Sequence, residues 1–138
     1  MRYPAELVAP FSKDLTDFGF EGLLTPESVT EAISNTKGTT LVVVNSVCGC
    51  AAANARPAAK MAIQNDKKPD KITTVFAGVD IEATAKAREF MVPYPPSSPS
   101  MALFKDGQLV HFIERMEIEG KTAESIALNL VSAFDEHC

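Results

Sequence analysis

Two of the three cysteines in this chain, Cys48 and Cys50, are separated by the single residue Gly49. They stand where a β-branched run, LVVV, gives way to an alanine-rich stretch that begins at Ala51. Cysteines this close together have three interpretations: a redox-active pair, part of a metal site, or two small buried residues without a chemical role. The surrounding sequence distinguishes among the three.

The position of the pair favours a thiolate. A strand followed by Cys-Gly-Cys and a helix puts both thiols at a helix N-terminus, where unpaired N–H groups and the helix dipole favour an anion. The pKa of a thiol at such a position falls below the free value of about 8.5. No aspartate or glutamate lies between Glu31 and Asp66, although the chain has 18 of them, whereas Lys37, Arg56 and Lys60 all fall in this window.

The spacing of the pair is suited to disulfide exchange. Residues i and i+2 can reach the Cα separation of about 4.4–6.8 Å that a disulfide tolerates, although the ring is small and strained. Strain makes a disulfide easier to reduce and therefore more oxidising. Gly49 fits the bend that such a ring requires, because glycine adopts φ and ψ values that other residues avoid.

The other two interpretations find less support. A zinc site normally needs four nitrogen or sulfur ligands, and only His111, His137 and Cys138 remain, none of them spaced locally with the pair. A purely structural role is disfavoured because the carboxyl ends of parallel strands, where both cysteines are expected, commonly form sites. Cys138 is the last residue and is expected to be an incidental thiol.

Length and composition are those of one globular domain. The chain has 138 residues, of which 46% are apolar and 22% charged. The net charge of −5, without any Lys/Arg run, lacks the electrostatic footprint of a nucleic-acid binder. No aliphatic run approaches the roughly 20 residues of a membrane span, and the first residues lack the apolar core of a secretory signal. An odd number of cysteines argues against a secreted disulfide scaffold, so a cytoplasmic location is expected.

The elements that must position the cysteines alternate along the chain. Two helices are predicted between Ala5 and Thr36, the second with Thr25 as N-cap and Pro26 in its first position. The run 39–46 is apolar on consecutive positions, as expected of a strand buried on both faces. A helix over 50–66 follows, kinked by an internal proline, Pro57. A strand over 71–80, a helix over 81–91 and a proline-rich loop are predicted next.

The C-terminal third is predicted to be a hairpin and a helix. Asp106-Gly107 is a strong two-residue turn signal within the run 101–113. The last helix is expected to begin near Thr122 and to bury one face. That face consists of Ala123, Ile126, Ala127, Leu130 and Phe134. The β-α-β unit should be parallel with a right-handed crossover, and the hairpin should extend the same sheet with antiparallel strands.

The motifs resemble a known fold and family. Cys-Gly-Cys at a strand–helix junction, a proline inside that helix and a proline before MALFKDG resemble the thioredoxin fold. VNSVCGCAAANARPA after LVVV, with GFEGLLTPESV nearer the N-terminus, resembles the bacilliredoxin family, thiol–disulfide isomerases with a CGC motif. This likeness covers nearly the whole chain. It implies an α/β thioredoxin-like domain over 1–138, with a mixed sheet of four or five strands flanked by helices. Residues 1–37 would form an N-terminal helical region and 38–138 the core.

The resemblance also implies an activity. Bacilliredoxins remove bacillithiol, a cysteine-based thiol that carries a malate group, from mixed disulfides on other proteins. By position, Cys48 is the attacking thiol, Cys50 the resolving thiol, and Pro99 the cis-proline beside the active site. Gly49, Ser98 and Pro99 would bind substrate. The implied co-substrate is bacillithiol, without a bound cofactor, and the implied partners are bacillithiolated or disulfide-containing cytosolic proteins, with neither nucleic acid nor membrane.

One departure from thioredoxins bears on the substrate. Thioredoxins carry a tryptophan before the first cysteine and a buried aspartate in the preceding strand, and LVVVNSV has neither. Attack by one thiol on a small-thiol adduct needs no such carboxylate. Arg56 and Lys60, two and three turns into the active-site helix, either bind the malate carboxylates or are ordinary solvated positions. A protein disulfide isomerase or oxidase, and a metal-binding or metal-delivery module, remain as alternative functions.

Overall fold

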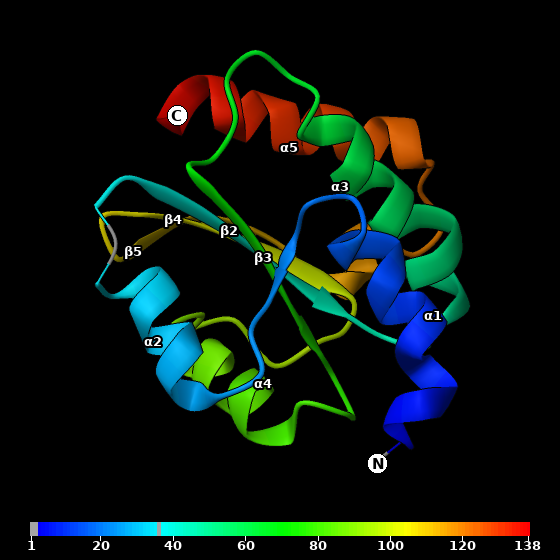
Figure 1. The fold of residues 1–138 in the computed structure, drawn as a ribbon. Coiled ribbons are helices and arrows are strands. Elements are labelled where there is room, and N and C mark those ends of the chain that lie inside the picture. Colours follow the sequence, from blue (N-terminus) through cyan, green and yellow to red (C-terminus); the bar gives the residue numbers. More distant parts are fainter. Residues whose placement is uncertain (1–2, 36) are drawn as a thin grey trace.

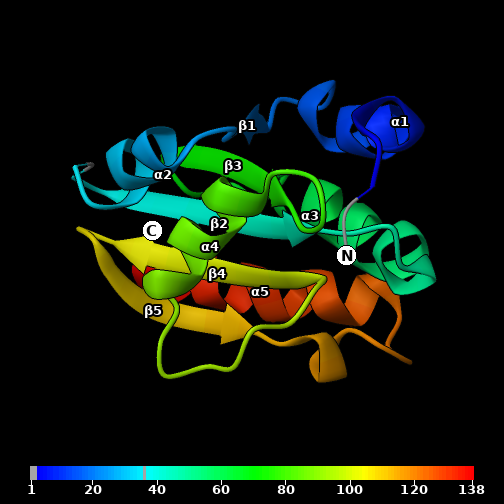
Figure 2. The same cartoon turned by 90° about the horizontal axis from the view of Figure 1, so that it is seen from below.

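The computed structural model describes residues 3–35 and 37–138 and shows a five-stranded mixed sheet between two layers of helices (Figures 1 and 2). The strand order is β1-β3-β2-β4-β5, with β1, β2 and β3 parallel and β4 and β5 antiparallel to their neighbours. The strands are β1 (Glu21–Gly22), β2 (Thr39–Asn45), β3 (Lys71–Phe76), β4 (Ser100–Lys105) and β5 (Gln108–Ile113). The predicted mixed α/β sheet is therefore confirmed.

The helices divide between the two faces of the sheet (Figure 2). On one face the apolar side chains of α1, α3 and α5 join a core cluster with the sheet, and on the other those of α2 and α4 do. The helices are α1 (Ala5–Thr16), α2 (Pro26–Ile33), α3 (Arg56–Ala62), α4 (Ile81–Glu89) and α5 (Ala123–His137). Among the described residues, no helix is long and apolar enough to span a membrane.

Strand β2 is the centre of the molecule and leads to the cysteines. All seven of its residues are buried, because both faces of the sheet are covered, as the run of consecutive apolar residues predicts. The hairpin β4–β5 turns at Asp106-Gly107, where φ is 50° and 83°. Positive φ at both positions matches the strand twist, which is why this dipeptide predicts the turn correctly.

The helix boundaries follow the predicted capping residues. The Thr25 side chain accepts a hydrogen bond from the Ser28 N–H at the start of α2, and Thr122 caps α5 in the same way. Four residues of the predicted face of α5 are buried, and Ala123 packs against the same cluster. Helix α2 ends at Ile33, and Thr36, the predicted end of this region, lies outside the described residues.

Three features differ from the predicted elements. Glu21–Gly22 forms the edge strand β1, so the predicted N-terminal helical region also contributes to the sheet. A short 3-10 turn, η2 (Arg115–Glu117), follows β5. The helix after the cysteines begins with a π-helical turn, η1 (Ala51–Ala55), instead of being α-helical throughout. Pro57 has no N–H to donate, and the Arg56 N–H bonds to the Ala51 carbonyl, five residues back, so the proline stands at the start of α3.

Candidate active site

The two cysteines lie together at the C-terminal end of β2, where the helix begins. Both are free and half-buried, and their Sγ atoms are 2.6 Å apart. The Cys50 N–H donates to Cys48 Sγ over 3.4 Å, and the Ala51 N–H donates to the Cys48 carbonyl over 3.0 Å. The pair therefore occupies the helix N-terminus that the sequence predicts.

The environment makes the two thiols unequal. The hydrogen bond from Cys50 is the largest influence on the pKa of Cys48 and lowers it. Burial opposes this effect, while the N–H groups of Cys50 and Ala51 and the charge of Arg115 reinforce it, so the pKa stays below its ordinary value. Burial, the hydrogen bond to Cys48 and its charge together raise the pKa of Cys50 to about 11. These surroundings favour the thiolate form of Cys48 and the protonated form of Cys50.

Arg115 completes the site and was not anticipated. Its Nη2 lies 3.3 Å from Cys48 Sγ, and its Nη1 donates to the Ser98 carbonyl over 3.3 Å. Nη2 also pairs with Glu119 Oε2 at 3.0 Å. Arg115 is 67 residues from Cys48 in the chain and belongs to no local motif. Only the fold, which brings η2 alongside the end of β2, reveals it.

The proline loop lies where the resemblance places it. The Ser98–Pro99 peptide bond is cis, Pro99 is buried, and Ser98 lines the same pocket as Cys48. The Val92–Pro93 bond is cis as well, which the sequence does not predict. Ser98 is thus brought beside Cys48, while its role and that of Pro99 in binding substrate remain predictions.

Gly49 is not in the left-handed region of the backbone map in this structure. Its φ is not positive, and a Cβ placed on it would meet nothing within 4 Å. With both thiols free, the bend between the cysteines does not require glycine, and the fit of Gly49 to a disulfide ring stays a prediction. Gly49 is exposed and leaves the surface beside both sulfur atoms open. Any contribution to substrate binding comes from this open surface.

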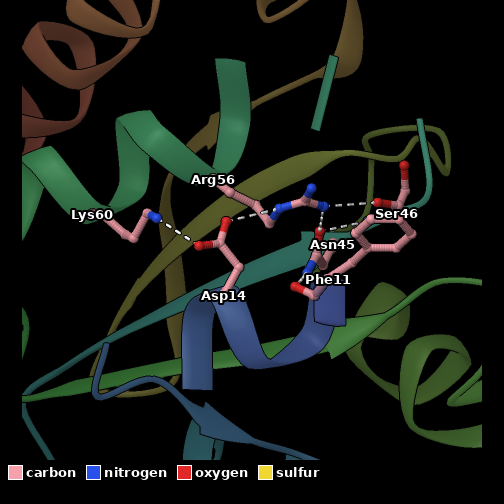
Figure 3. Close-up of polar contacts among 6 residues, drawn as sticks. All are labelled: Phe11, Asp14, Asn45, Ser46, Arg56 and Lys60. Carbon is pink, nitrogen blue, oxygen red and sulfur yellow. Dashed lines mark hydrogen bonds and ion pairs between the residues drawn. The ribbon is translucent and has the colours of Figure 1, made fainter. Parts of the chain in front are cut away.

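Arg56 does not point to the thiols but is buried between α1 and the end of β2 (Figure 3). Its Nε pairs with Asp14 Oδ2 at 3.1 Å, and its Nη1 donates to Asn45 Oδ1 and the Ser46 carbonyl. Lys60 Nζ pairs with the other Asp14 oxygen at 2.6 Å. The expectation that Arg56 binds substrate is not supported by this placement. A solvated position is excluded too, since its side chain is 5% exposed.

The Arg56 contacts instead support the loop that carries Cys48. Asn45 Oδ1 accepts hydrogen bonds from Arg56 and from the Ser46 N–H, and Ser46 Oγ accepts one from the Cys48 N–H over 3.0 Å. Burial raises the pKa of Asp14, but Lys60 and Arg56 outweigh burial and hold that pKa below its ordinary value. Two of the three cations of the acid-free window, Arg56 and Lys60, are thus paired with a carboxylate of α1. The activation of Cys48 comes from its closer neighbours.

The remaining thiol and the histidines form no second site. The Cys138 thiol interacts with the Thr39 hydroxyl, at the opposite end of β2 from Cys48. Within residues 3–35 and 37–138, no three His, Cys, Asp or Glu side chains are grouped so as to hold a metal ion.

Comparison with solved structures identifies the fold. Mitochondrial thioredoxin 3 of Saccharomyces cerevisiae superposes with a TM-score of 0.58 at 19% identity, over 89% of this chain and 98% of that one. A Fasciola hepatica thioredoxin gives 0.57 at 17% identity, over 86% and 100%. Both comparisons show the thioredoxin fold, and the paired thiols lie at the end of its strand β2.

Sequence comparison gives the family. The family model described as "Disulphide isomerase" matches residues 3–138. A bacilliredoxin of Halalkalibacterium halodurans is 56% identical over 136 residues, which are 99% of this chain and 94% of that protein. A bacilliredoxin of Cytophaga hutchinsonii is 54% identical over 134 residues, 97% and 98% of the two chains. The chain belongs to the bacilliredoxin family, as its CGC motif indicates. It is therefore a thiol–disulfide oxidoreductase with the thioredoxin fold.

Proposed function

We propose that this oxidoreductase removes bacillithiol from mixed disulfides on cytosolic proteins, with Cys48 attacking and Cys50 resolving. The observation that carries the proposal is the asymmetry of the pair. The pKa of Cys48 is lowered by a hydrogen bond from Cys50 and by Arg115, while that of Cys50 is raised to about 11. The relatives' name, bacilliredoxin, supports the choice of thiol.

The chemistry balances as two exchanges. The Cys48 thiolate attacks the bacillithiol sulfur of the mixed disulfide, and the client protein leaves as its thiolate. Bacillithiol is then disulfide-bonded to Cys48. Either Cys50 attacks Cys48 Sγ, releasing bacillithiol and leaving a Cys48–Cys50 disulfide, or a second bacillithiol attacks the adduct and leaves as the symmetrical disulfide. In the first route, an external thiol then reduces the Cys48–Cys50 disulfide and so completes the cycle.

The test compares two small-thiol adducts of one client protein. A single-cysteine protein is modified with bacillithiol or with glutathione, and release of the client thiol is followed with the wild-type chain and free thiol present. We expect faster removal of bacillithiol. Equal rates, or faster removal of glutathione, would contradict the assignment of bacillithiol.

Disulfide isomerisation is a second candidate, favoured by the 2.6 Å separation of the two sulfur atoms, from which a small movement closes a disulfide. A client with scrambled disulfides distinguishes it, because an isomerase restores client activity without net release of a small thiol.

A metal-binding module is tested by metal analysis of protein purified without oxidation. About one tightly held metal ion per chain would contradict the redox proposal.

A further inference from the structure

A pocket opens beside Cys48 that the thiol exchange itself does not require. Its volume is about 440 Å³, within the range of about 300–1,000 Å³ typical of small-molecule sites. The end of β2, the loop after β3, helix α4 and the proline loop supply its walls. The lining residues are Tyr3, Ser46, Val47, Cys48, Ala77, Gly78, Arg88, Ser98 and Arg115. Two arginines and no carboxylate are among them, so the pocket is cationic in a chain whose net charge is −5.

Of these two arginines, Arg88 makes fewer polar contacts. Its Nη2 donates to the Ser97 carbonyl over 3.4 Å. Its Nε is buried and has no hydrogen-bond partner among the described residues. No carboxylate is paired with it in the part of the chain that the structure describes. Burial without a counter-charge also lowers the pKa of Arg88. Arg115, in contrast, is engaged by the Cys48 thiolate, the Ser98 carbonyl and Glu119.

We propose that this pocket is a carboxylate subsite, in which Arg88 binds an acidic group of the small thiol that becomes disulfide-bonded to Cys48. A carboxylate suits a pocket-lining guanidinium that has no carboxylate partner in the described chain, since it accepts charge-assisted hydrogen bonds and supplies the missing counter-charge. The identity of this thiol as bacillithiol rests on the proposed function. The subsite requires only that the thiol carries a carboxylate.

The subsite determines which of the two sulfur atoms of a mixed disulfide Cys48 attacks. A mixed disulfide offers two sulfur atoms, and attack on either one is chemically possible. When the acidic moiety occupies the pocket, its own sulfur is held against Cys48 Sγ. Cys48 then bonds to the small thiol and the client protein leaves as the thiolate. The reverse choice would trap the client on Cys48 and release the small thiol.

The experiment uses the full chain with Cys50→Ser, so that adducts on Cys48 accumulate. Two symmetrical disulfides are compared: that of 3-mercaptopropionate, which carries carboxylates, and that of 2-mercaptoethanol, which is neutral. In each case the Cys48 thiolate displaces one thiolate and keeps the other half, and intact mass measures the rate. The ratio of the rate with the acidic disulfide to the rate with the neutral disulfide measures how much the subsite contributes. We expect Arg88→Gln to lower this ratio about tenfold, as loss of a charge-assisted hydrogen bond implies, and to leave the neutral rate unchanged.

Two further variants test this result. Arg88→Lys keeps the charge and should restore part of the ratio. Lys86→Gln is the matched control, because it removes one positive charge from the same helix at a residue paired with Glu89, outside the pocket lining, and should change nothing. An unchanged ratio in Arg88→Gln overturns the subsite. A fall of both rates together also overturns it, because Arg88 would then only hold the Ser97 loop in place.

The outcomes separate the two proposals. If the wild-type chain fails to prefer the bacillithiolated client but the ratio still depends on Arg88, the subsite stands and the choice of bacillithiol is wrong. If bacillithiol is preferred and the ratio is independent of Arg88, the proposed function stands and the subsite is wrong.

Discussion

At the scale of single residues, the unequal surroundings of the two sulfur atoms lead us to expect different roles for the two cysteines. Cys48→Ser leaves a hydroxyl that is not ionised at neutral pH, so exchange should be lost. Cys50→Ser keeps an attacking thiolate and removes only the internal resolving group. The mixed disulfide on Cys48 should then accumulate, which intact mass detects, and excess bacillithiol should restore part of the turnover. Equal residual activity in the two variants would contradict these roles.

Arg115 belongs to the same scale because it acts on one atom. Since the pKa of Cys48 is lowered, its rate of alkylation by iodoacetamide should reach half of its plateau at a pH below the ordinary thiol value. In Arg115→Gln the thiolate loses a nearby positive charge, so this midpoint should move to higher pH. The reaction is followed by peptide mass, which counts alkylation of Cys48 separately from that of Cys50 and Cys138. A midpoint unaffected by the substitution would remove Arg115 from the activation of Cys48.

At the scale of elements, Asp14 joins helix α1 to the active-site helix through Arg56 and Lys60 (Figure 3). Asp14→Asn leaves the buried guanidinium of Arg56 without a carboxylate. Because the Asp14 side chain is 37% exposed, solvent screening limits the expected loss in the free energy of unfolding to about 1 kcal/mol at pH 7. Urea denaturation measures it. Asp17→Asn, an exposed position at the end of the same helix, is the matched control.

The pH dependence of this loss follows from the sign of the shift. The folded-state pKa of Asp14 lies below the ordinary value of 3.8. Its contribution to stability is therefore complete above pH values near 5 and is lost as the pH falls through 3.8 toward the folded pKa. The difference in the free energy of unfolding between the wild type and Asp14→Asn should become smaller as the pH falls over that range. A difference independent of pH would mean that the charge of Asp14 contributes nothing.

A structural feature could be predicted from the sequence where the residues that determine it are close together in the chain. Asp106-Gly107 and the Thr25 cap act within three residues of themselves, and both elements form as predicted. Strand β1 has only two residues, too few for any alternation to be visible. The surroundings of Arg56 depend on Asp14, which is 42 residues earlier in the chain.

The arginines beside the thiols escaped prediction for the same reason. Arg115 reaches Cys48 across 67 residues, and Arg88 comes from helix α4, whose own sequence is that of an ordinary surface helix. A single sequence contains the chemistry of the cysteine pair but not the contacts between distant segments. The pairing of the two thiols at the strand–helix junction could therefore be predicted, and the groups around them could not.

At the scale of the whole molecule, the division into an N-terminal region over 1–37 and a core over 38–138 is open to test. Strand β1 pairs with β3, and Arg56 holds α1 against the end of β2, so we expect both parts to unfold in one transition. The chain has two tyrosines and no tryptophan, one tyrosine in each part. Tyr94→Phe leaves Tyr3 as the reporter of the first part, and Tyr3→Phe leaves Tyr94 as that of the second. Their urea transitions should coincide with that of far-UV circular dichroism. A Tyr3 transition at lower urea would show that the first part unfolds separately.

The contact between the two sulfur atoms also bears on the order in which Cys48 and Cys50 react. After burial, the largest causes that keep Cys50 protonated are the hydrogen bond to Cys48 and its negative charge. Both disappear once Cys48 Sγ enters a disulfide, because that sulfur is then neutral. We therefore expect Cys50 to become more acidic only after its neighbour has reacted. The resting molecule would then present one reactive sulfur atom to an oxidant, and its second nucleophile would form only once a thiol is bound to Cys48.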